Sequence, residues 1–293
     1  MSQDVRATLC LMAEESQPRR RPSPVRDRLV RTAVAQIERQ GMTVSLEHIS
    51  LERVIAESGV SRASAYRHFA NKAEFLTDVL TTVVRSTRLE GESPAEVEEL
   101  LGLLTQHEDG LSTEQGRRDL AVEGLRRAAR SDFERIATSP QWHTYVALHA
   151  TCRGLPHGEL RSQVLEALAD TEAQFTAQRA VVYARLATLL GYRLVPPLTA
   201  PEGFLVMADA AGALMTGLMV RTGILRDTGP DLMRLAAHGS TETAEWTWPA
   251  FHLAGLILAH LEPDPDITWD AAQQARSTAA MDEMLVAVAQ MRT

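Results

Sequence analysis

The apolar residues of this chain recur mainly three and four positions apart, the spacing of one face of a helix. One such stripe predicts a helix over residues 24–40, and it consists of Val25, Leu29, Ala33 and Ile37. A second stripe begins near Asn71. We find no convincing run of alternating β-branched residues, while alanine and leucine are abundant and aromatic residues make up only 5%. The pattern therefore predicts an all-α protein.

Glycine and proline divide the remainder of the chain into further helices. A linker with Gly91, Ser93 and Pro94 as helix breakers follows the segment that begins near Asn71. Beyond it the spacing predicts helices at about 94–107, 113–138, 140–153, 159–191, 201–225, 231–238, 242–262 and 267–291. Residues 1–22 contain Pro18, Pro22 and three consecutive arginines, which favours a disordered basic arm.

Two short helical segments separated by a glycine lie between residues 50 and 72. Leu51, Val54 and Ile55 share one face of the first segment. Gly59 falls where the chain leaves that segment with a positive φ, which costs glycine little, and Ser61 suits the N-cap of the second segment. This order is typical of a helix-turn-helix that reads DNA. A plain helical hairpin with a glycine corner is the alternative, and Gly-Val-Ser alone would favour it.

The second segment carries small and polar residues where it would lie in a DNA groove. Arg62 can hydrogen bond bidentately to guanine, and Ala63 and Ala65 permit close approach to the DNA. Other side chains of the segment can donate to phosphate oxygens. Lys72, the only lysine of the chain, supplies an ammonium at the start of the next helix. The predicted DNA-binding residues are Ser61, Arg62, Ala63, Ser64, Tyr66, Arg67, His68 and Lys72.

The segment that ends in Tyr66-Arg67-His68-Phe69-Ala70-Asn71-Lys72, with Gly59-Val60-Ser61 before it, resembles the TetR family of transcriptional regulators. The resemblance covers about 60 residues, from about Val25 to Val84. There are two departures from the family pattern. The loop over residues 41–50 is a few residues longer than usual, which allows a short extra turn, and Ala65 stands where a larger aliphatic residue is common, so looser packing is expected there.

The resemblance implies an N-terminal three-helix helix-turn-helix domain and a larger C-terminal helical domain for ligand binding and dimerisation. The expected boundaries are 1–22 for the arm, 23–88 for the DNA-binding domain and 89–293 for the body. The resemblance also implies a homodimer that binds a near-palindromic operator in double-stranded DNA and is released by a small-molecule effector. Such a protein is no enzyme and needs no cofactor. The sequence leaves open whether the regulator represses or activates.

Charge is unevenly distributed along the chain. The net charge of −8 at first argues against a nucleic-acid partner, but Arg19 to Glu90 holds 13 basic and 8 acidic residues. The stretch is therefore at about +5 and the remainder at about −13, which suits a protein that touches DNA with one end only. The two cysteines, Cys10 and Cys152, indicate no disulfide framework, and no convincing signal peptide is present, so we expect a cytoplasmic protein.

The run from Phe204 to Leu225 is long and apolar enough to consider as a membrane span, but Asp209 and Arg221 lie inside it. We interpret it as a buried interface helix and expect no membrane partner. Its interface face would consist of Phe204, Ala208, Ala211, Met215, Leu218 and Thr222. Together with residues 246–261, two such helices from each protomer could form a four-helix interface. The alternative is that both segments are the core of a monomer.

Aromatic and methionine side chains in the middle of the body are candidates for an effector pocket, with plain core packing as the alternative. They are Trp142, Tyr145, His149, Phe175, Tyr183 and Met207. His149, Cys152 and His157, with His143 before them, have a spacing compatible with zinc, although surface or core histidines are the simpler interpretation. No nucleophile, phosphate-loop or dinucleotide motif is present. Two rival hypotheses are a binding module that does not read DNA and an enzyme that uses the His/Cys cluster.

Overall fold

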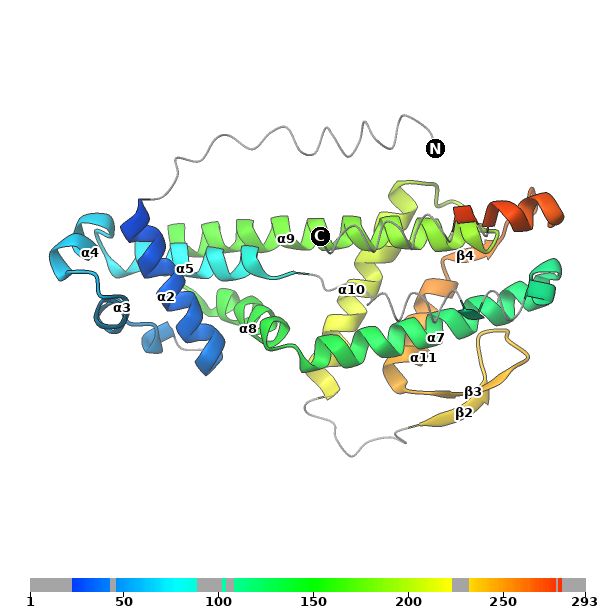
Figure 1. Ribbon diagram of the computed structural model, residues 1–293, viewed down its shortest axis with the longest axis horizontal. Coiled ribbons are helices and arrows are strands. Elements are labelled where there is room, and N and C mark those ends of the chain that lie inside the picture. The colour runs from blue at the N-terminus through cyan, green and yellow to red at the C-terminus, as the bar shows by residue number, and fades with distance from the viewer. Residues whose placement is uncertain are drawn as a thin grey trace.

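The computed structural model describes residues 23–42, 46–88, 102–103, 108–222, 232–277 and 279–280. These residues are mostly helical, which confirms the predicted fold class. The molecule is elongated, with α3 and α4 at one end and the small β-strands at the other (Figure 1). The predicted arm over residues 1–22, most of the predicted helix 94–107 and about half of the predicted helix 267–291 lie outside the described residues.

A head of four α-helices and one short 3₁₀ turn forms the N-terminal end. Its elements are α2 (Pro24–Gln40), η1 (Leu46–His48), α3 (Leu51–Ser58), α4 (Arg62–His68) and α5 (Lys72–Ser86). Each α-helix begins after a polar side chain that accepts the backbone N–H of the residue three positions on. Those N-caps are Ser23, Ser50, Ser61 and Asn71. The caps satisfy donors that a helix cannot satisfy itself, so the start of each helix is encoded locally.

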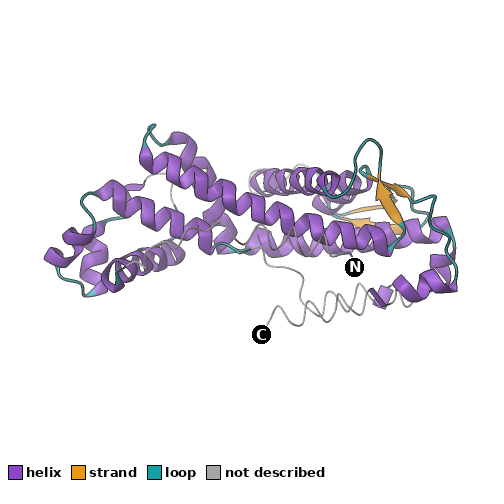
Figure 2. Ribbon diagram, turned by 90° about the horizontal axis from the view of Figure 1, so that it is seen from above, coloured by secondary structure: helices purple, strands orange, loops and turns teal. Residues whose placement is uncertain are grey.

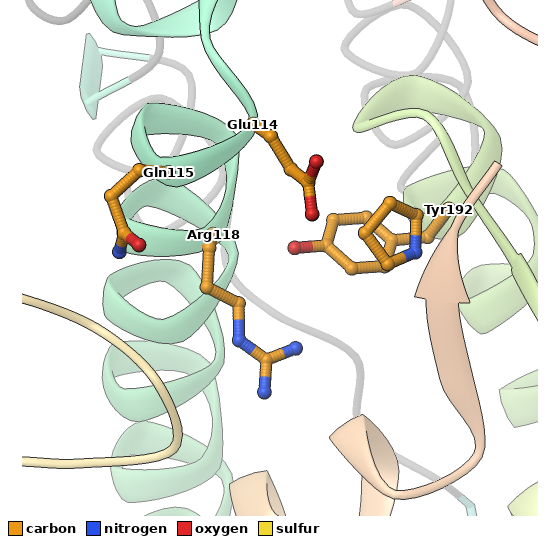
Figure 3. A pocket seen from close by; sticks show the side chains of 5 residues that line it. Glu114, Gln115, Arg118 and Tyr192 are labelled. Carbon is orange, nitrogen blue, oxygen red and sulfur yellow. The ribbon is translucent and has the colours of Figure 1, made fainter. Parts of the chain in front are cut away.

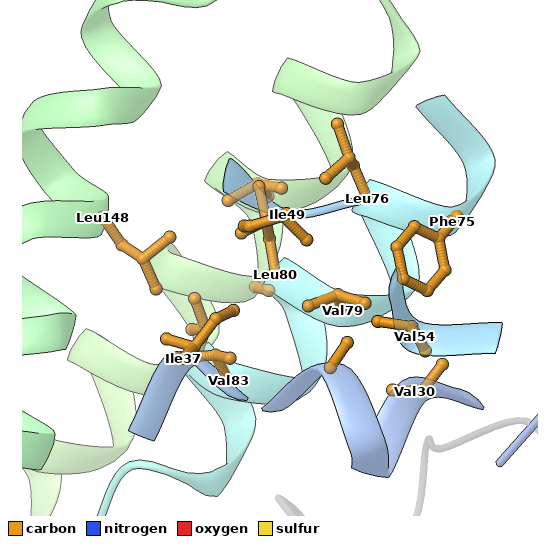
Figure 4. Close-up of a cluster of buried hydrophobic side chains, with 14 of the residues drawn as sticks. Val30, Ile37, Ile49, Val54, Phe75, Leu76, Val79, Leu80, Val83 and Leu148 are labelled. Carbon is orange, nitrogen blue, oxygen red and sulfur yellow. The ribbon is translucent and has the colours of Figure 1, made fainter. Parts of the chain in front are cut away.

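The head packs around a buried apolar centre that also includes Leu148 of the body (Figure 4). Phe69 and Phe75 are both fully buried and meet edge to face, with ring centroids 5.3 Å apart. At Ala65, where the sequence predicts looser packing, the methyl group is fully buried. In the long loop between α2 and α3, η1 is the short extra turn that the sequence allows, and Ile49 after it is buried in the same centre.

Five longer helices build the body. They are α7 (Glu114–Thr138), α8 (Pro140–Gly154), α9 (Glu159–Leu189), α10 (Glu202–Thr222) and α11 (Trp248–Leu258), with the short turn η2 (Glu108–Ser112) before them. The first four lie within three residues of the predicted ranges at each end. With 31 residues, α9 is about 46 Å long and runs along most of the molecule, beside α5 at one end and the strands at the other (Figures 1 and 2).

Two antiparallel two-stranded sheets correct the helical prediction for the C-terminal part. The segment predicted as a helix over 231–238 contains β2 (Met233–Ala236), which pairs with β3 (Thr243–Trp246). The segment predicted as one helix over 242–262 contains β3, α11 and the beginning of β4 (Leu261–Pro263), which pairs with β1 (Tyr192–Leu194). Strands of three or four residues are too short to show an alternating pattern against a helical one, so periodicity could not distinguish them.

Two hydrophobic cores follow each other along the molecule. The first joins the head to α8 and the first part of α9, and Phe75 of α5 and Phe175 of α9 both belong to it. The second joins α7, the last part of α9, α10, α11 and the strands. Because α9 contributes to both cores and packs along α5, a change in the body can reach the head through continuous packing.

The face of α10 that the sequence predicts as an interface lies inside the protomer, so that prediction is wrong. Phe204, Ala208 and Ala211 are all buried in the second core, and Met215 and Leu218 pack against it. The periodicity was right about an apolar face, but a neighbouring helix of the same chain covers it. The exposed side of α10 is the opposite one, and it is also partly apolar, with Leu205, Val206 and Val220 exposed.

Candidate nucleic-acid interface

The turn between α3 and α4 has the backbone that the sequence predicts. Gly59 is left-handed, with φ 68° and ψ 12°, and a Cβ added there would meet nothing within 4 Å. The glycine is therefore required by backbone conformation and not by crowding. Val60 packs against the first core, and the Ser61 hydroxyl accepts the backbone N–H of Ser64 at 3.2 Å. These contacts fix the start of α4 relative to α3.

Helix α4 turns one side to the core and the other to solvent. Ala65 points inward and is fully buried, so the prediction that it permits close approach to the DNA is wrong, and Phe69 directly after the helix is buried as well. Ser64 and His68 are half-buried. The exposed residues of the predicted DNA-binding set are Ser61, Arg62, Ala63, Tyr66, Arg67 and Lys72. The structure thus brings six of the eight predicted residues to an open, largely basic surface.

Tyr66 is held by an acidic residue that the sequence analysis did not select. Its side chain is 50% exposed, and its hydroxyl donates to Glu52 Oε1 at 3.1 Å. The same carboxylate accepts the Ser50 hydroxyl at 3.0 Å. Its own backbone N–H, followed by these two hydroxyls, keeps the pKa of Glu52 below its usual range. Glu52 therefore stays ionised and orients Tyr66 beside the exposed face of α4.

His68 is turned toward the head instead of straight into solvent. The Ser23 hydroxyl lies 3.2 Å from His68 Nδ1 and 3.4 Å from Nε2. Ser23 is also the N-cap of α2, so the contact links the end of α4 to the start of α2. A phosphate contact by His68 stays a prediction, and it would require the ring to share or leave this hydroxyl.

Arg26 joins three helices of the head and is the main residue that sequence reasoning missed. Its Nε donates to Asp78 Oδ2 at 2.5 Å, and its Nη1 donates to Glu74 Oε1 at 2.8 Å. The same Nη1 donates to the carbonyl of His68 at 3.0 Å, and the guanidinium lies 4.7 Å from the Phe69 ring centroid. The Asp78 carboxylate, together with Glu74, raises the Arg26 pKa despite the opposing effect of burial.

The reason that sequence reasoning missed Arg26 is the distance along the chain. Its partners lie 42 to 52 positions later, so no local pattern marks it. The available signal was the pair Glu74 and Asp78, two carboxylates four positions apart on one face of a helix. Such a pair repels itself unless a cation lies between the two groups.

The start of α5, where Lys72 lies, is fixed by reciprocal capping. The Asn71 side chain accepts the Glu74 backbone N–H at 2.9 Å, and the Glu74 carboxylate accepts the Ala70 backbone N–H at 3.0 Å. This arrangement is a capping box with asparagine at the N-cap. It holds the first turn of α5 so that Lys72 is exposed beside the end of α4.

In the body, the structure brings together four of the six predicted pocket residues. Phe175 of α9 lies between two aromatic rings of α8, with centroids 5.4 Å from Trp142 and 5.8 Å from Tyr145. His149 contacts Tyr145 edge to face at 4.8 Å. Tyr183 and Met207 belong to the second core instead, so they do not complete this aromatic cluster.

Polar groups accompany the aromatic cluster. The Tyr145 hydroxyl donates to Glu172 Oε1 at 3.0 Å, and His149 Nε2 lies 3.5 Å from the same oxygen. Burial, reinforced by Glu172, raises the Tyr145 pKa, whereas the contact with His149 is the main cause that lowers the Glu172 pKa. Trp142 Nε1 is buried without a hydrogen-bond partner among the described residues. The cluster combines apolar walls with one unused donor.

Two histidines of the predicted zinc pattern have other partners. His143 Nε2 lies 2.8 Å from the Ala137 carbonyl oxygen, and His157 lies beside Arg161. Burial raises the pKa of the Cys152 thiol. Across the part of the chain that the structure describes, no group of three or more histidine, cysteine, aspartate or glutamate side chains could hold a metal ion.

One described helix, Glu202–Arg221, is long and apolar enough to cross a membrane by length and composition alone. Its mean hydropathy is 1.7, and 28% of its most apolar stretch is buried in the protomer. The absence of a membrane partner stays a prediction.

Comparison with known proteins gives one match. Residues 29–79 match the family described as bacterial regulatory proteins, tetR family, and this range begins in α2 and ends in α5. No curated protein and no solved structure matches the chain. The matched range contains the glycine turn, all of α4 and Lys72. Residues 29–79 are therefore the N-terminal helix-turn-helix domain of the tetR family, and the chain that carries them is a DNA-binding transcriptional regulator and not an enzyme.

Proposed function

We propose that this protein is a homodimeric regulator that binds a near-palindromic operator and is released by a small-molecule effector, most simply as a repressor in the cytoplasm. Each protomer would place α4 in a major groove of double-stranded DNA, in two grooves about 34 Å apart. The observation that carries the proposal is the exposed face of α4, with Arg62, Ala63 and Arg67 outward and the other face anchored in the core. A helix that reads bases in the major groove needs one face packed firmly on the protein and polar side chains exposed on the other face.

The exposed side of α10 supports the homodimer. Leu205, Val206 and Val220 are exposed at 40%, 51% and 48%, although they are apolar. Between them lie Ala213 and Gly217, two small exposed residues four positions apart. A Cβ on Gly217 would meet nothing within 4 Å, so the protomer itself does not require a glycine there. Close packing of a second α10 against this face would bury the exposed apolar side chains, and the small residues would allow the two helices to approach closely.

The effector would act through the aromatic cluster of α8 and α9. This cluster lies in the first core, which also contains α5 and the head. A ligand that separates Phe175 from Trp142 would shift α9 against α5 and change the spacing of the two heads. The loss of operator affinity would equal the difference in ligand binding between the two arrangements. Release would thus need no chemical step.

Selection of bound sequences from a random double-stranded DNA pool by the full chain tests the proposal. We expect a two-fold symmetric motif whose half-sites are about one helical turn apart. A motif without symmetry would contradict the homodimeric reading. No enriched motif even at low salt would contradict sequence-specific reading and favour a binding module that does not read DNA.

A further inference from the structure

A cavity at the far end of the body is separate from both the DNA-binding face and the aromatic cluster. It has a volume of about 400 Å³, within the range of small-molecule sites. Three of its lining residues, Glu114, Gln115 and Arg118, come from the first turns of α7 (Figure 3). Tyr192 of β1 and Pro263 of β4, which face each other in the sheet, complete it.

Tyr192 brings an unused polar group into the wall of this cavity. The residue is only 6% exposed, and its hydroxyl is buried with no hydrogen-bond partner among the described residues. Figure 3 shows this hydroxyl pointing into the space between the Glu114 carboxylate and the Arg118 guanidinium. Buried hydroxyls are nearly always hydrogen-bonded, because leaving one unsatisfied is destabilising. The hydroxyl therefore lacks a partner that a bound molecule could provide.

Glu114 and Arg118 place opposite charges on two sides of that hydroxyl. They lie four positions apart on one helix, in the order that normally favours an ion pair. They form no ion pair in the described structure, because Arg118 Nε donates to the His238 carbonyl at 2.7 Å and draws the guanidinium aside. The site thus presents a carboxylate and a guanidinium with a hydroxyl between them.

The walls of the cavity are held in place without a ligand. Gln115 Nε2 donates to Asp119 Oδ1 and to the carbonyl of Gly239, both at 3.0 Å, which ties the first turn of α7 to the β2–β3 hairpin. A site whose walls are fixed beforehand loses little entropy when it binds a ligand.

The Tyr192 side is fixed as well. Gly191 has a φ of 67°, and a Cβ there would lie 2.7 Å from Trp269 Nε1, so the turn before β1 and the Trp269 ring pack in direct contact. The Arg117 guanidinium lies 4.7 Å from the centroid of the same ring. Burial is the main cause that raises the Tyr192 pKa, against the neighbouring Arg118 guanidinium, which lowers it, so the hydroxyl is a neutral donor.

We propose that this cavity binds a small zwitterion that carries a carboxylate beside a protonated amine, as a free amino acid does. The carboxylate would accept from the Tyr192 hydroxyl and from the Arg118 guanidinium. The ammonium would donate to Glu114, and the side chain would lie along Pro263. The assignment does not depend on DNA binding or on an effector in the aromatic cluster.

Titration calorimetry of the full chain with each of the proteinogenic amino acids at millimolar concentration tests the proposal. We expect at least one to bind, and its N-acetyl and amide derivatives, which each lack one charge, to bind at least about tenfold more weakly. The zwitterion assignment would be overturned if no amino acid bound. It would also be overturned if the two derivatives bound as tightly as the parent amino acid. Neither result would bear on operator binding, which is measured separately.

Variants locate the binding in this cavity. Tyr192→Phe removes only the hydroxyl and should raise the Kd about tenfold, while Tyr66→Phe makes the same change on α4 and should leave the Kd unaltered. Glu114→Gln should also raise the Kd about tenfold or more. The Glu114 side chain is exposed, so this substitution should not disturb folding. An unchanged Kd in both Tyr192→Phe and Glu114→Gln would place the bound molecule elsewhere.

Discussion

Single residues of the head fall into two groups, those that would touch DNA and those that hold the touching residues in place. Arg62 and Lys72 are exposed and belong to the first group. Arg26 belongs to the second, since it bonds to α5 and to the carbonyl of His68 at the end of α4. The two groups should respond differently to substitution, because only the first changes the contacts with DNA directly.

Arg62→Ala should weaken operator binding by about 1–3 kcal/mol and relax specificity at one base position. The reason is that a bidentate contact to guanine distinguishes one base pair from the others. Both effects are measured by the binding of the variant to operators in which each base pair is substituted in turn. Arg31→Ala is a matched control, because Arg31 is exposed on α2 and pairs with Asp27 of the same helix. Unchanged operator choice in Arg62→Ala would rule out its role in reading a base.

Lys72→Ala should weaken binding to all DNA sequences alike and reduce the slope of log Kd against log salt by about one. A phosphate contact releases a counterion and carries no sequence information, so the two effects belong together. Measurement of Kd across a salt series on an operator and on unrelated DNA checks both. An unchanged slope would show that Lys72 does not contact a phosphate.

Arg26→Met should destabilise the head by about 1–3 kcal/mol, because Asp78 and Glu74 would lose their shared cation. Methionine keeps the apolar packing of the arginine side chain, so the substitution tests the charge and its hydrogen bonds. Denaturant unfolding of the full chain measures the loss. Arg31→Met removes an exposed i, i+4 pair, which is worth about 0–0.5 kcal/mol, and is the control. Equal effects of the two substitutions would show that the Arg26 contacts do not stabilise the head.

At the scale of elements, one carboxylate of α7 accepts three hydrogen bonds from the turn of the β2–β3 hairpin. Asp119 accepts the Ser240 hydroxyl and the Thr241 backbone N–H, each at 2.8 Å, and the Thr241 hydroxyl at 3.0 Å. Burial alone would raise the Asp119 pKa, but these donors, with the amide of Gln115, lower it below the usual range. The hairpin turn therefore depends on a charged acceptor from a helix about 120 positions earlier in the chain.

Asp119→Asn should reduce stability near neutral pH by about 1–3 kcal/mol, because a neutral amide is a weaker acceptor for these donors. The folded-state pKa of Asp119 is lowered, so its stabilisation is fully present above the unfolded pKa of about 3.9 and is lost as pH falls through the lower folded value. The difference between the two proteins in unfolding free energy should therefore shrink below about pH 4.

Unfolding curves over a pH series measure this difference. Asp266→Asn serves as the control, since the Asp266 side chain is 90% exposed. A difference between wild type and Asp119→Asn that stays constant down to low pH would contradict the role of the charged carboxylate.

At the scale of the whole molecule, α9 connects the two ends. Phe175 lies in the core that contains the head, and Ala180, five positions later, lies in the core that contains α10 and the sheets. The proposed effector cluster lies on the head side of this division, and the zwitterion cavity lies at the other end (Figure 1). The proposed dimer face on α10 lies between them, so packed helices connect both sites to the proposed interface.

Gly217→Glu should convert the proposed dimer to a monomer without unfolding the protomer. The protomer leaves open space around Gly217, whereas two apposed α10 helices would bury the new charges. Light scattering at micromolar concentration measures the mass. Gly124→Glu is the matched control, because a Cβ at this helical glycine of α7 also meets nothing within 4 Å. A dimer that survives Gly217→Glu would place the interface elsewhere.

The sequence by itself determined those features whose causes lie within a few residues. The serine and asparagine caps, the left-handed Gly59 and the inward Phe69 specify the helix-turn-helix, and the long apolar stripes specify α7 to α10. Local hydrogen bonds and a helical period of 3.6 can be read from a short window. For this reason the helices of the head, and the exposure of six of the eight residues predicted to bind DNA, could be predicted from the sequence.

Only the tertiary structure decided the features whose partners are distant in the chain. The Arg26 contacts and the Asp119 attachment join residues 42 to 122 positions apart, and β1 pairs with β4 about 70 positions later. The sequence likewise marked α10 as apolar but not which side the protomer would cover. Burial is a property of the assembled surface, and a strand three residues long is stabilised by its partner instead of by its own pattern. The cavity around Tyr192 could not be predicted from the sequence either, because its walls come from α7, β1 and β4, which meet only in the folded protein.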